Sequence, residues 1–242
     1  MRETPPRHDE RPREMAARGL HDAAFLVLAA HTGPPDASCV IDVGAGAGAF
    51  SRRLLTAGYT VCACDLHPEL FRVPDITCLP VSHSGELPYA DKTADAVVAL
   101  ELFERIDGHE ALLREIHRVL KPGGTLLLTT PNILNLKSRI LFLLTGYFYN
   151  FPPLDPDVRD PVRQHISAFS LDRYRWRLKQ SGFDLAAVSV DRYRFSSWAW
   201  AYLVPLIRLV TWRKARGLRN FRMQNMTRVL FGRILILRAT RT

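Results

Sequence analysis

The sequence lacks the features of secreted and zinc-binding proteins. It has four cysteines, Cys39, Cys62, Cys64 and Cys78, and none has the paired Cys/His spacing of a zinc site. Residues 2–13 are polar and interrupted by proline, with no apolar signal segment. We therefore expect buried, reduced thiols, no metal, a cytoplasmic location and a disordered N-terminal tail over residues 1–14.

Acidic side chains are missing from residues 192–242, which hold 12 of the 33 Lys and Arg residues of the chain. The formal net charge of +9 therefore arises in the last fifth of the sequence. A block of one sign usually faces an anionic partner, either phospholipid or nucleic acid.

No internal repeat is present, and a hydrophobic content of 47% over 242 residues suits one α/β domain. Apolar patterning and turn residues predict strands at 39–43, 59–64, 76–81, 95–100, 125–130, 185–190 and 232–240. The same signals predict helices at 15–30, 50–57, 110–120 and 170–181. Strands that alternate with helices indicate βαβ units and a parallel sheet.

The stretch VIDVGAGAGAFS, residues 40–51, places three glycines at alternate positions after an apolar run. Glycine lets a strand turn into a helix and lets a ligand approach main-chain N–H groups. The spacing Gly44-x-Gly46-x-Gly48 is typical of a methyl-donor loop, but Gly44-x-Gly46-x-x-Ala49 also satisfies the dinucleotide fingerprint. Asp65 ends the next predicted strand and can accept both hydroxyls of a ribose, which suits either cofactor.

Residues 87–132, LPYADKTADAVVALELFERIDGHEALLREIHRVLKPGGTLLLTTPN, resemble class I S-adenosylmethionine-dependent methyltransferases of the ubiquinone-biosynthesis-like branch. The resemblance covers roughly residues 38–185 and the last strand. It implies an α/β fold with a doubly wound, seven-stranded, mostly parallel sheet of the Rossmann-like methyltransferase type, in which the last strand is antiparallel. It also implies a single domain over 15–242, an enzyme, and S-adenosyl-L-methionine as cofactor.

In that family the glycine loop holds the methionine part of the donor, the acid after the second strand holds the ribose, and the loop after the third strand covers the adenine. The resemblance thus assigns cofactor binding to Asp42, Gly44, Ala45, Gly46, Gly48, Asp65, Leu66, Ser84 and Glu101. Two positions depart from the pattern. His83 and Ser84 stand where relatives have an adenine-binding Asp, and Arg105 stands where relatives have a His.

His165 precedes Ser170, the predicted cap of the helix at 170–181, in a stretch where relatives place substrate-facing residues. A histidine with a pKa near neutrality can remove a proton from a hydroxyl as the methyl group arrives, which makes His165 the candidate catalytic base. A structural histidine bonded to a loop carbonyl is the alternative. His67, His109 and His117 are interpreted as surface residues, and Glu101 and Glu104 either as pocket residues or as solvated loop acids.

Two apolar insertions, at about 134–160 and 193–231, exceed a minimal core. Both are expected at the cofactor side of the sheet or beside it, where they would form lids for an apolar or lipid-linked acceptor. Packing into the core or a homodimer interface is the alternative.

The segment 195–212 contains three tryptophans and a tyrosine around aliphatic residues, and Arg213, Lys214 and Arg216 follow it. Pro205 and Arg208 interrupt it, and its apolar part is shorter than the ~20 residues of a spanning helix. It is typical of a segment that lies in the headgroup region of an anionic membrane. We therefore expect peripheral attachment at the inner face of the membrane through residues 195–217.

Three functions follow from these observations. The first is an O-methyltransferase that acts on a small-molecule or lipid-linked acceptor of glycan or isoprenoid type. The second is a nucleic-acid or protein methyltransferase that uses the basic region, although its aromatic residues form a block and do not alternate with the basic ones, which argues against nucleic acid. The third is a non-catalytic module that binds the donor.

Overall fold

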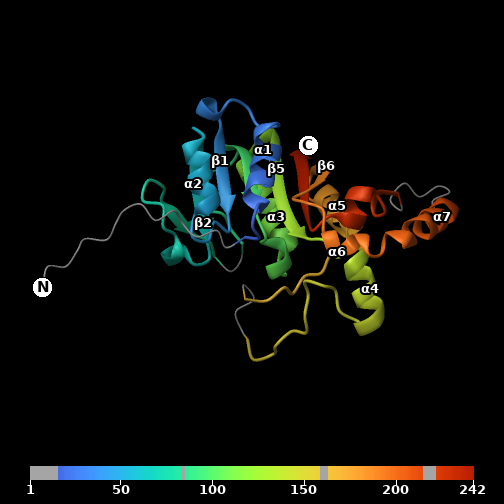
Figure 1. Cartoon of the computed structure of the whole chain (residues 1–242). Coiled ribbons are helices and arrows are strands. Elements are labelled where there is room, and N and C mark those ends of the chain that lie inside the picture. The colour runs from blue at the N-terminus through green and yellow to red at the C-terminus, as the bar shows by residue number, and fades with distance from the viewer. Residues whose placement is uncertain (1–15, 83–84, 159–162, 215–221) are drawn as a thin grey trace, which may run out of the picture.

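The computed structural model describes residues 16–82, 85–158, 163–214 and 222–242. The predicted tail at 1–14 and the predicted adenine contact Ser84 lie outside these ranges. Within them the chain folds around one central sheet with helices on both faces (Figure 1).

The sheet has seven strands in the order β3-β2-β1-β4-β5-β7-β6. The strands are β1 (Cys39–Val43), β2 (Thr60–Asp65), β3 (Cys78–Pro80), β4 (Ala94–Ala99), β5 (Leu120–Pro131), β6 (Phe183–Val190) and β7 (Ile234–Arg241). Strands β1 to β5 pair in parallel, and β7 lies antiparallel between β5 and β6. The predicted doubly wound sheet with an antiparallel last strand is confirmed.

Four helices cover the two faces of this sheet: α1 (Leu20–Ala29), α2 (Ala49–Thr56), α3 (His109–Val119) and α5 (Leu171–Gln180). The other described helices are α4 (Leu136–Thr145), α6 (Phe195–Trp198), α7 (Val204–Lys214) and α9 (Thr227–Phe231), and short 3-10 turns are η1 (Pro35–Ala37), η2 (Pro68–Leu70), η3 (Phe103–Arg105) and η5 (Ala201–Leu203). Apolar residues of α1 and α2 form one core with the strands, and those of α3 and α5 form the other. Alternate strand residues serve the two cores because successive side chains of a strand point to opposite faces.

Several element boundaries differ from the sequence prediction by one to five residues, three of them at the following elements. The first helix begins at Leu20, because Gly19 has φ +82° and precedes it as a left-handed cap. The strand predicted at 125–130 already begins at Leu120, which pairs with Ala94 before a shift of register. The third strand is confined to Cys78–Pro80. Ser170 caps α5 as predicted, since its Oγ accepts a hydrogen bond from the N–H of Arg173.

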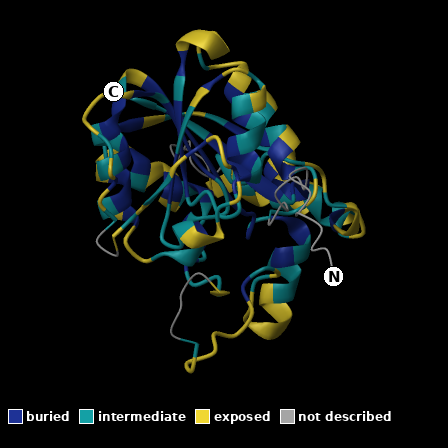
Figure 2. Cartoon of the chain, turned by 90° about the vertical axis from the view of Figure 1, so that its left-hand side faces the viewer, coloured by how far each residue is buried: buried dark blue, intermediate teal, exposed yellow. Residues whose placement is uncertain are grey.

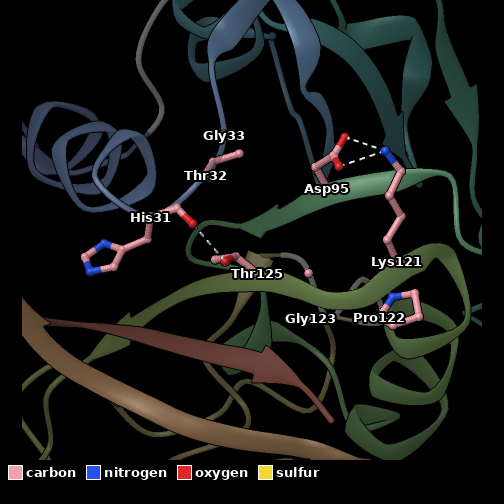
Figure 3. A pocket seen from close by; sticks show the side chains of 9 residues that line it. His31, Thr32, Gly33, Asp95, Lys121, Pro122, Gly123 and Thr125 are labelled. Atoms are coloured by element: carbon pink, nitrogen blue, oxygen red, sulfur yellow. Dashed lines mark hydrogen bonds and ion pairs between the residues drawn. The ribbon is translucent and has the colours of Figure 1, made fainter.

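The LKPGG stretch, residues 120–124, is the first part of β5 and lies at the amino end of β4. Lys121 Nζ lies 2.7 Å from Asp95 Oδ1 (Figure 3). Asp95 Oδ2 also accepts a hydrogen bond from the N–H of Cys39. A Cβ at Gly124 would lie 2.8 Å from the carbonyl oxygen of Lys121. This stretch borders a hollow of about 220 Å³, and a larger cleft of about 880 Å³ runs along α5 and β6. Neither is lined by a residue of the glycine loop.

The two insertions leave the same edge of the sheet. Helix α4 follows the carboxyl end of β5, and α6 to α7 follow that of β6, which runs in the same direction as β5 because both are antiparallel to β7. Helix α4 extends beyond the sheet and α7 projects outward past β6 (Figure 1). No helix within the described residues is long and apolar enough to cross a membrane.

Candidate cofactor and acceptor site

The glycine loop connects β1 to α2 beside the point where the strand order reverses, between β1 and β4. Gly44, Gly46 and Gly48 have φ values of +73°, +52° and +87°, a region that L side chains rarely adopt. A Cβ at Gly48 would lie 2.7 Å from the side chains of Phe71 and Val73. The loop is therefore a backbone cradle that only glycine can form, and it leads directly into the N-terminus of α2.

Asp65 faces this cradle from the end of β2. Its Oδ2 accepts a hydrogen bond from the N–H of Gly46 at 2.8 Å, and its Oδ1 accepts one from the N–H of His67 at 2.8 Å. The N–H groups of Gly44 and Ala45 both donate to the carbonyl oxygen of Cys64. Carboxylate and loop are thus in direct contact, and the half-buried Leu66 follows them.

Asp42 lies beneath the loop and not in it. Its side chain is buried, and its Oδ2 accepts a hydrogen bond of 2.6 Å from Ser51 Oγ on α2. Burial, with a smaller effect from the charge of Asp65, raises the pKa of Asp42 to about 6. The contact ties β1 to α2 on either side of the glycines, so Asp42 supports the shape of the cradle.

Glu101 lies directly after β4, at the same edge. It has φ +49°, one of two such non-glycine residues in the described ranges, and its N–H donates to Thr129 Oγ1. Glu101 Oε2 accepts a hydrogen bond from the N–H of Ala17, and burial raises the pKa of the Glu101 carboxyl. The neighbouring Leu102 packs on Gly44, where a Cβ would lie 3.2 Å from Leu102 Cδ1. An observed strain of this kind is typical of functional sites.

His165 is held beside the turn that follows β4. The N–H groups of Ile166 and Ser167 donate to the carbonyl oxygen of Glu104 at 2.8 and 3.0 Å. The half-buried imidazole of His165 lies against Phe151, with its Nδ1 2.7 Å from the carbonyl oxygen of Asn150. Since a carbonyl only accepts, Nδ1 carries the proton and Nε2 keeps its lone pair. Burial lowers the pKa of His165, which keeps the ring neutral at pH 7.

Glu104 is fully buried, so its interpretation as a solvated loop acid is wrong. Neither carboxyl oxygen finds a hydrogen-bond partner among the described residues. Burial raises the pKa of Glu104 to about 8, and the charge of Glu101 acts in the same direction. Glu104 lies in the short turn η3 after β4, outside any helix or strand whose apolar periodicity could mark a buried position. No local sequence signal could therefore reveal its burial.

His109 is also buried, contrary to the surface position predicted for it. Its Nε2 lies 2.6 Å from the carbonyl oxygen of Phe103, and its ring contacts Phe169 and Tyr174. His67 and His117 are half-buried. Of the four cysteines, all free, only Cys64 is buried, and the other three are half-buried.

Comparisons with known proteins identify the family. The profile of a family described as a methyltransferase domain matches residues 8–188. A stretch of 102 residues is 38% identical to a ubiquinone biosynthesis O-methyltransferase of Xanthomonas oryzae pv. oryzae, over 38% of this chain and 43% of that protein. A stretch of 93 residues is 32% identical to a demethylmenaquinone methyltransferase of Tropheryma whipplei, over 36% and 39%. The chain thus spans about two fifths of each of these relatives.

The fold is also found among solved structures. The 1,6-didemethyltoxoflavin-N1-methyltransferase of Burkholderia thailandensis, solved with bound 1,6-didemethyltoxoflavin and S-adenosylhomocysteine, superposes with a TM-score of 0.56 and 15% identity, covering 92% of this chain and 78% of that one.

Proposed function

The chain belongs to the methyltransferase domain family and is an S-adenosylmethionine-dependent enzyme, and from this premise we propose that it methylates a hydroxyl group of a small-molecule or lipid-linked acceptor. The finer assignment concerns the acceptor, the base and the residues that hold the donor. The curated relatives are named as methyltransferases for ubiquinone biosynthesis and for demethylmenaquinone. Their names support a small-molecule acceptor with an oxygen or carbon nucleophile.

We assign the donor to the cradle between Gly44 and Gly48 and to Asp65. The N-terminus of α2 favours a carboxylate, because its first N–H groups have no partner within the helix. The Asp65 carboxylate is held in place by two N–H groups, and two ribose hydroxyls fit its remaining lone pairs. We assign Ala45, Leu66 and Glu101 to the same site, because they lie on the loop, directly after Asp65 and shortly after β4. When bound, the donor supplies a methyl group on a positively charged sulfur.

His165 supplies the base. Its Nε2 would accept the proton of the acceptor hydroxyl, and the hydroxyl oxygen would receive the methyl group that the bound donor supplies. The imidazolium then releases its proton to solvent. The bond from Nδ1 to the carbonyl oxygen of Asn150 is the contact of the structural alternative, but it also fixes the tautomer in which Nε2 can accept a proton, and the proposal is based on this second property.

A matched pair of substitutions tests the base. His165→Ala is expected to lower turnover by about 10²- to 10⁴-fold with donor affinity unchanged, the range of general-base assistance. His31→Ala is the control, since His31 Nδ1 also contacts a carbonyl oxygen, that of Val27, but at the opposite edge of the sheet. Turnover in His165→Ala equal to that of the wild type would assign His165 to structure alone.

The acceptor class is tested separately. Donor with a labelled methyl group is incubated with the enzyme and a cell lipid extract, an RNA fraction or a protein fraction, and donor binding is measured by calorimetry. Label in the lipid extract that survives mild base indicates a methyl ether, whereas label that mild base releases indicates a methyl ester. Label in RNA or protein favours the second function, and binding of the donor without label in any fraction favours the third.

A further inference from the structure

The segment from α6 to α7 exposes an unusual amount of apolar surface. No residue of α7 is buried. Phe195 is 91% exposed, Tyr202 68%, Leu206 58% and Trp212 57%. Apolar side chains exposed singly are normal, but a group of this size on consecutive short helices marks an interaction surface.

One side of the segment is anchored, which leaves the other side accessible. Val204 and Ile207 pack against Leu230 and Phe231. Trp198 stacks on Phe231 with ring centroids 4.4 Å apart. The segment is therefore a fixed part of the fold, and its exposed side chains do not have to rearrange before they meet a partner.

Helix α4 begins beside this segment and carries exposed apolar residues at its far end. Phe142, Leu143 and Leu144 in its last turn are exposed. Near its start, Lys137 Nζ lies over the ring of Tyr149, and the guanidinium of Arg194 lies over the same ring, which connects α4 to the start of α6. Helices α4 and α6 also contact each other. We call α4 together with residues 195–214 the apolar lobe. Figure 2 shows the exposed end of α4 beyond the sheet.

Helix α7 is too short to span a membrane, and the charge of the apolar lobe indicates which partner it binds. Helix α7 has 11 residues, so it is about 16 Å long against a hydrocarbon core of about 30 Å. The lobe bears the exposed cations Arg208, Arg213 and Lys214, and residues 192–242 contain no acid. A second copy would bring like charges together, whereas an anionic lipid surface would neutralise them.

We propose that the apolar lobe docks on an anionic membrane, with Leu206 and Trp212 inserted at headgroup depth and Arg213 and Lys214 on lipid phosphates. Aromatic and basic side chains in this combination favour the interface. Because α4 and α6 both leave the carboxyl edge of the sheet, the docked protein presents the edge that carries the glycine loop to the lipid. This docking does not depend on the proposed acceptor or base.

Flotation of the full chain with vesicles tests the proposal. We expect the protein to float with equimolar phosphatidylcholine and phosphatidylglycerol at low salt, to dissociate at high salt, and to bind phosphatidylcholine alone weakly. Leu206→Ser with Trp212→Ser should weaken partitioning by about tenfold or more. Arg213→Gln with Lys214→Gln should weaken it by about tenfold.

Trp176→Ser is the matched control, because Trp176 on α5 is 53% exposed but lies outside the lobe; it should float like the wild type. Thermal unfolding establishes that each variant is folded. A soluble protein with both vesicles at low salt, equal binding to both vesicles, or a stable dimer that Trp212→Ser separates would each overturn the proposal. Donor calorimetry on the same variants keeps this result distinct from the proposed function, because neither pair touches the glycine loop.

Discussion

Replacement of Glu104 by glutamine should stabilise the protein at neutral pH. The carboxyl is fully buried with both oxygens unpartnered, and its pKa is raised from 4.5 to about 8. Between these two values the folded state holds a proton that the unfolded state has lost. Folding stability from this group is therefore fully present below pH 4.5 and is lost as pH rises towards 8.

The magnitude follows from the separation of the two pKa values. Each pH unit between them removes about 1.4 kcal/mol, so ionisation in the unfolded state costs the wild type about 3 kcal/mol of stability at pH 7. Glutamine has nearly the same shape and no charge to lose, so the variant should not show this loss. The free energy of unfolding of Glu104→Gln minus that of the wild type should rise with pH and level off near pH 8.

Urea unfolding at a series of pH values from 5 to 9 measures this difference. Glu86→Gln, which replaces an exposed glutamate, serves as the control. The new amide can also change the free energy of unfolding through its hydrogen bonds, but by the same amount at every pH. The test is therefore how the difference between variant and wild type changes with pH. A difference for Glu104→Gln that does not change with pH would refute a neutral Glu104 in the native protein.

Three further outcomes are expected. Asp65→Ala should weaken donor binding in calorimetry by about 2–3 kcal/mol, or roughly 30- to 150-fold, through loss of charge-assisted hydrogen bonds, and unchanged affinity in the folded variant would remove Asp65 from the donor site. Gly48→Ala should destabilise the fold by more than Gly123→Ala. Both glycines have positive φ, but only a Cβ at Gly48 would lie against side chains, those of Phe71 and Val73. Equal losses in urea unfolding, each about 1–3 kcal/mol, would mean that the cradle tolerates a methyl group. The rate of methyl transfer should fall as pH drops below the lowered pKa of His165 and stay flat above it, and a profile without this acid limb would exclude a titrating base.

Features that depend on neighbours in sequence were predictable. The glycine loop, Asp65 at the end of β2 and the cap at Ser170 all lie where the sequence predicts them, because a tight turn, a strand end and a helix start each impose residue types within a few positions. The antiparallel β7 came from the family resemblance, since local pattern does not determine strand direction.

Features that depend on distant contacts were not predictable. The burial of His109 arises from Phe169 and Tyr174, which lie 60 and more positions later. The start of β5 at Leu120 depends on pairing with β4. In both cases the local pattern predicts exposure to solvent. His109 is a polar residue at a helix start, and the PGG residues after Leu120 are typical of a turn.

The position of the candidate base is the most instructive case. His165 is held at the carboxyl edge by its neighbours Ile166 and Ser167, whose N–H groups bond the carbonyl oxygen of Glu104. Ser167 Oγ also donates to the carbonyl oxygen of Ile106 at 2.7 Å. These contacts use main-chain acceptors, so no side-chain type at 104 or 106 encodes them. The loop that presents His165 therefore depends on how the turn after β4 folds, and a substitution at Glu104 that shifts this turn would alter the base without touching it.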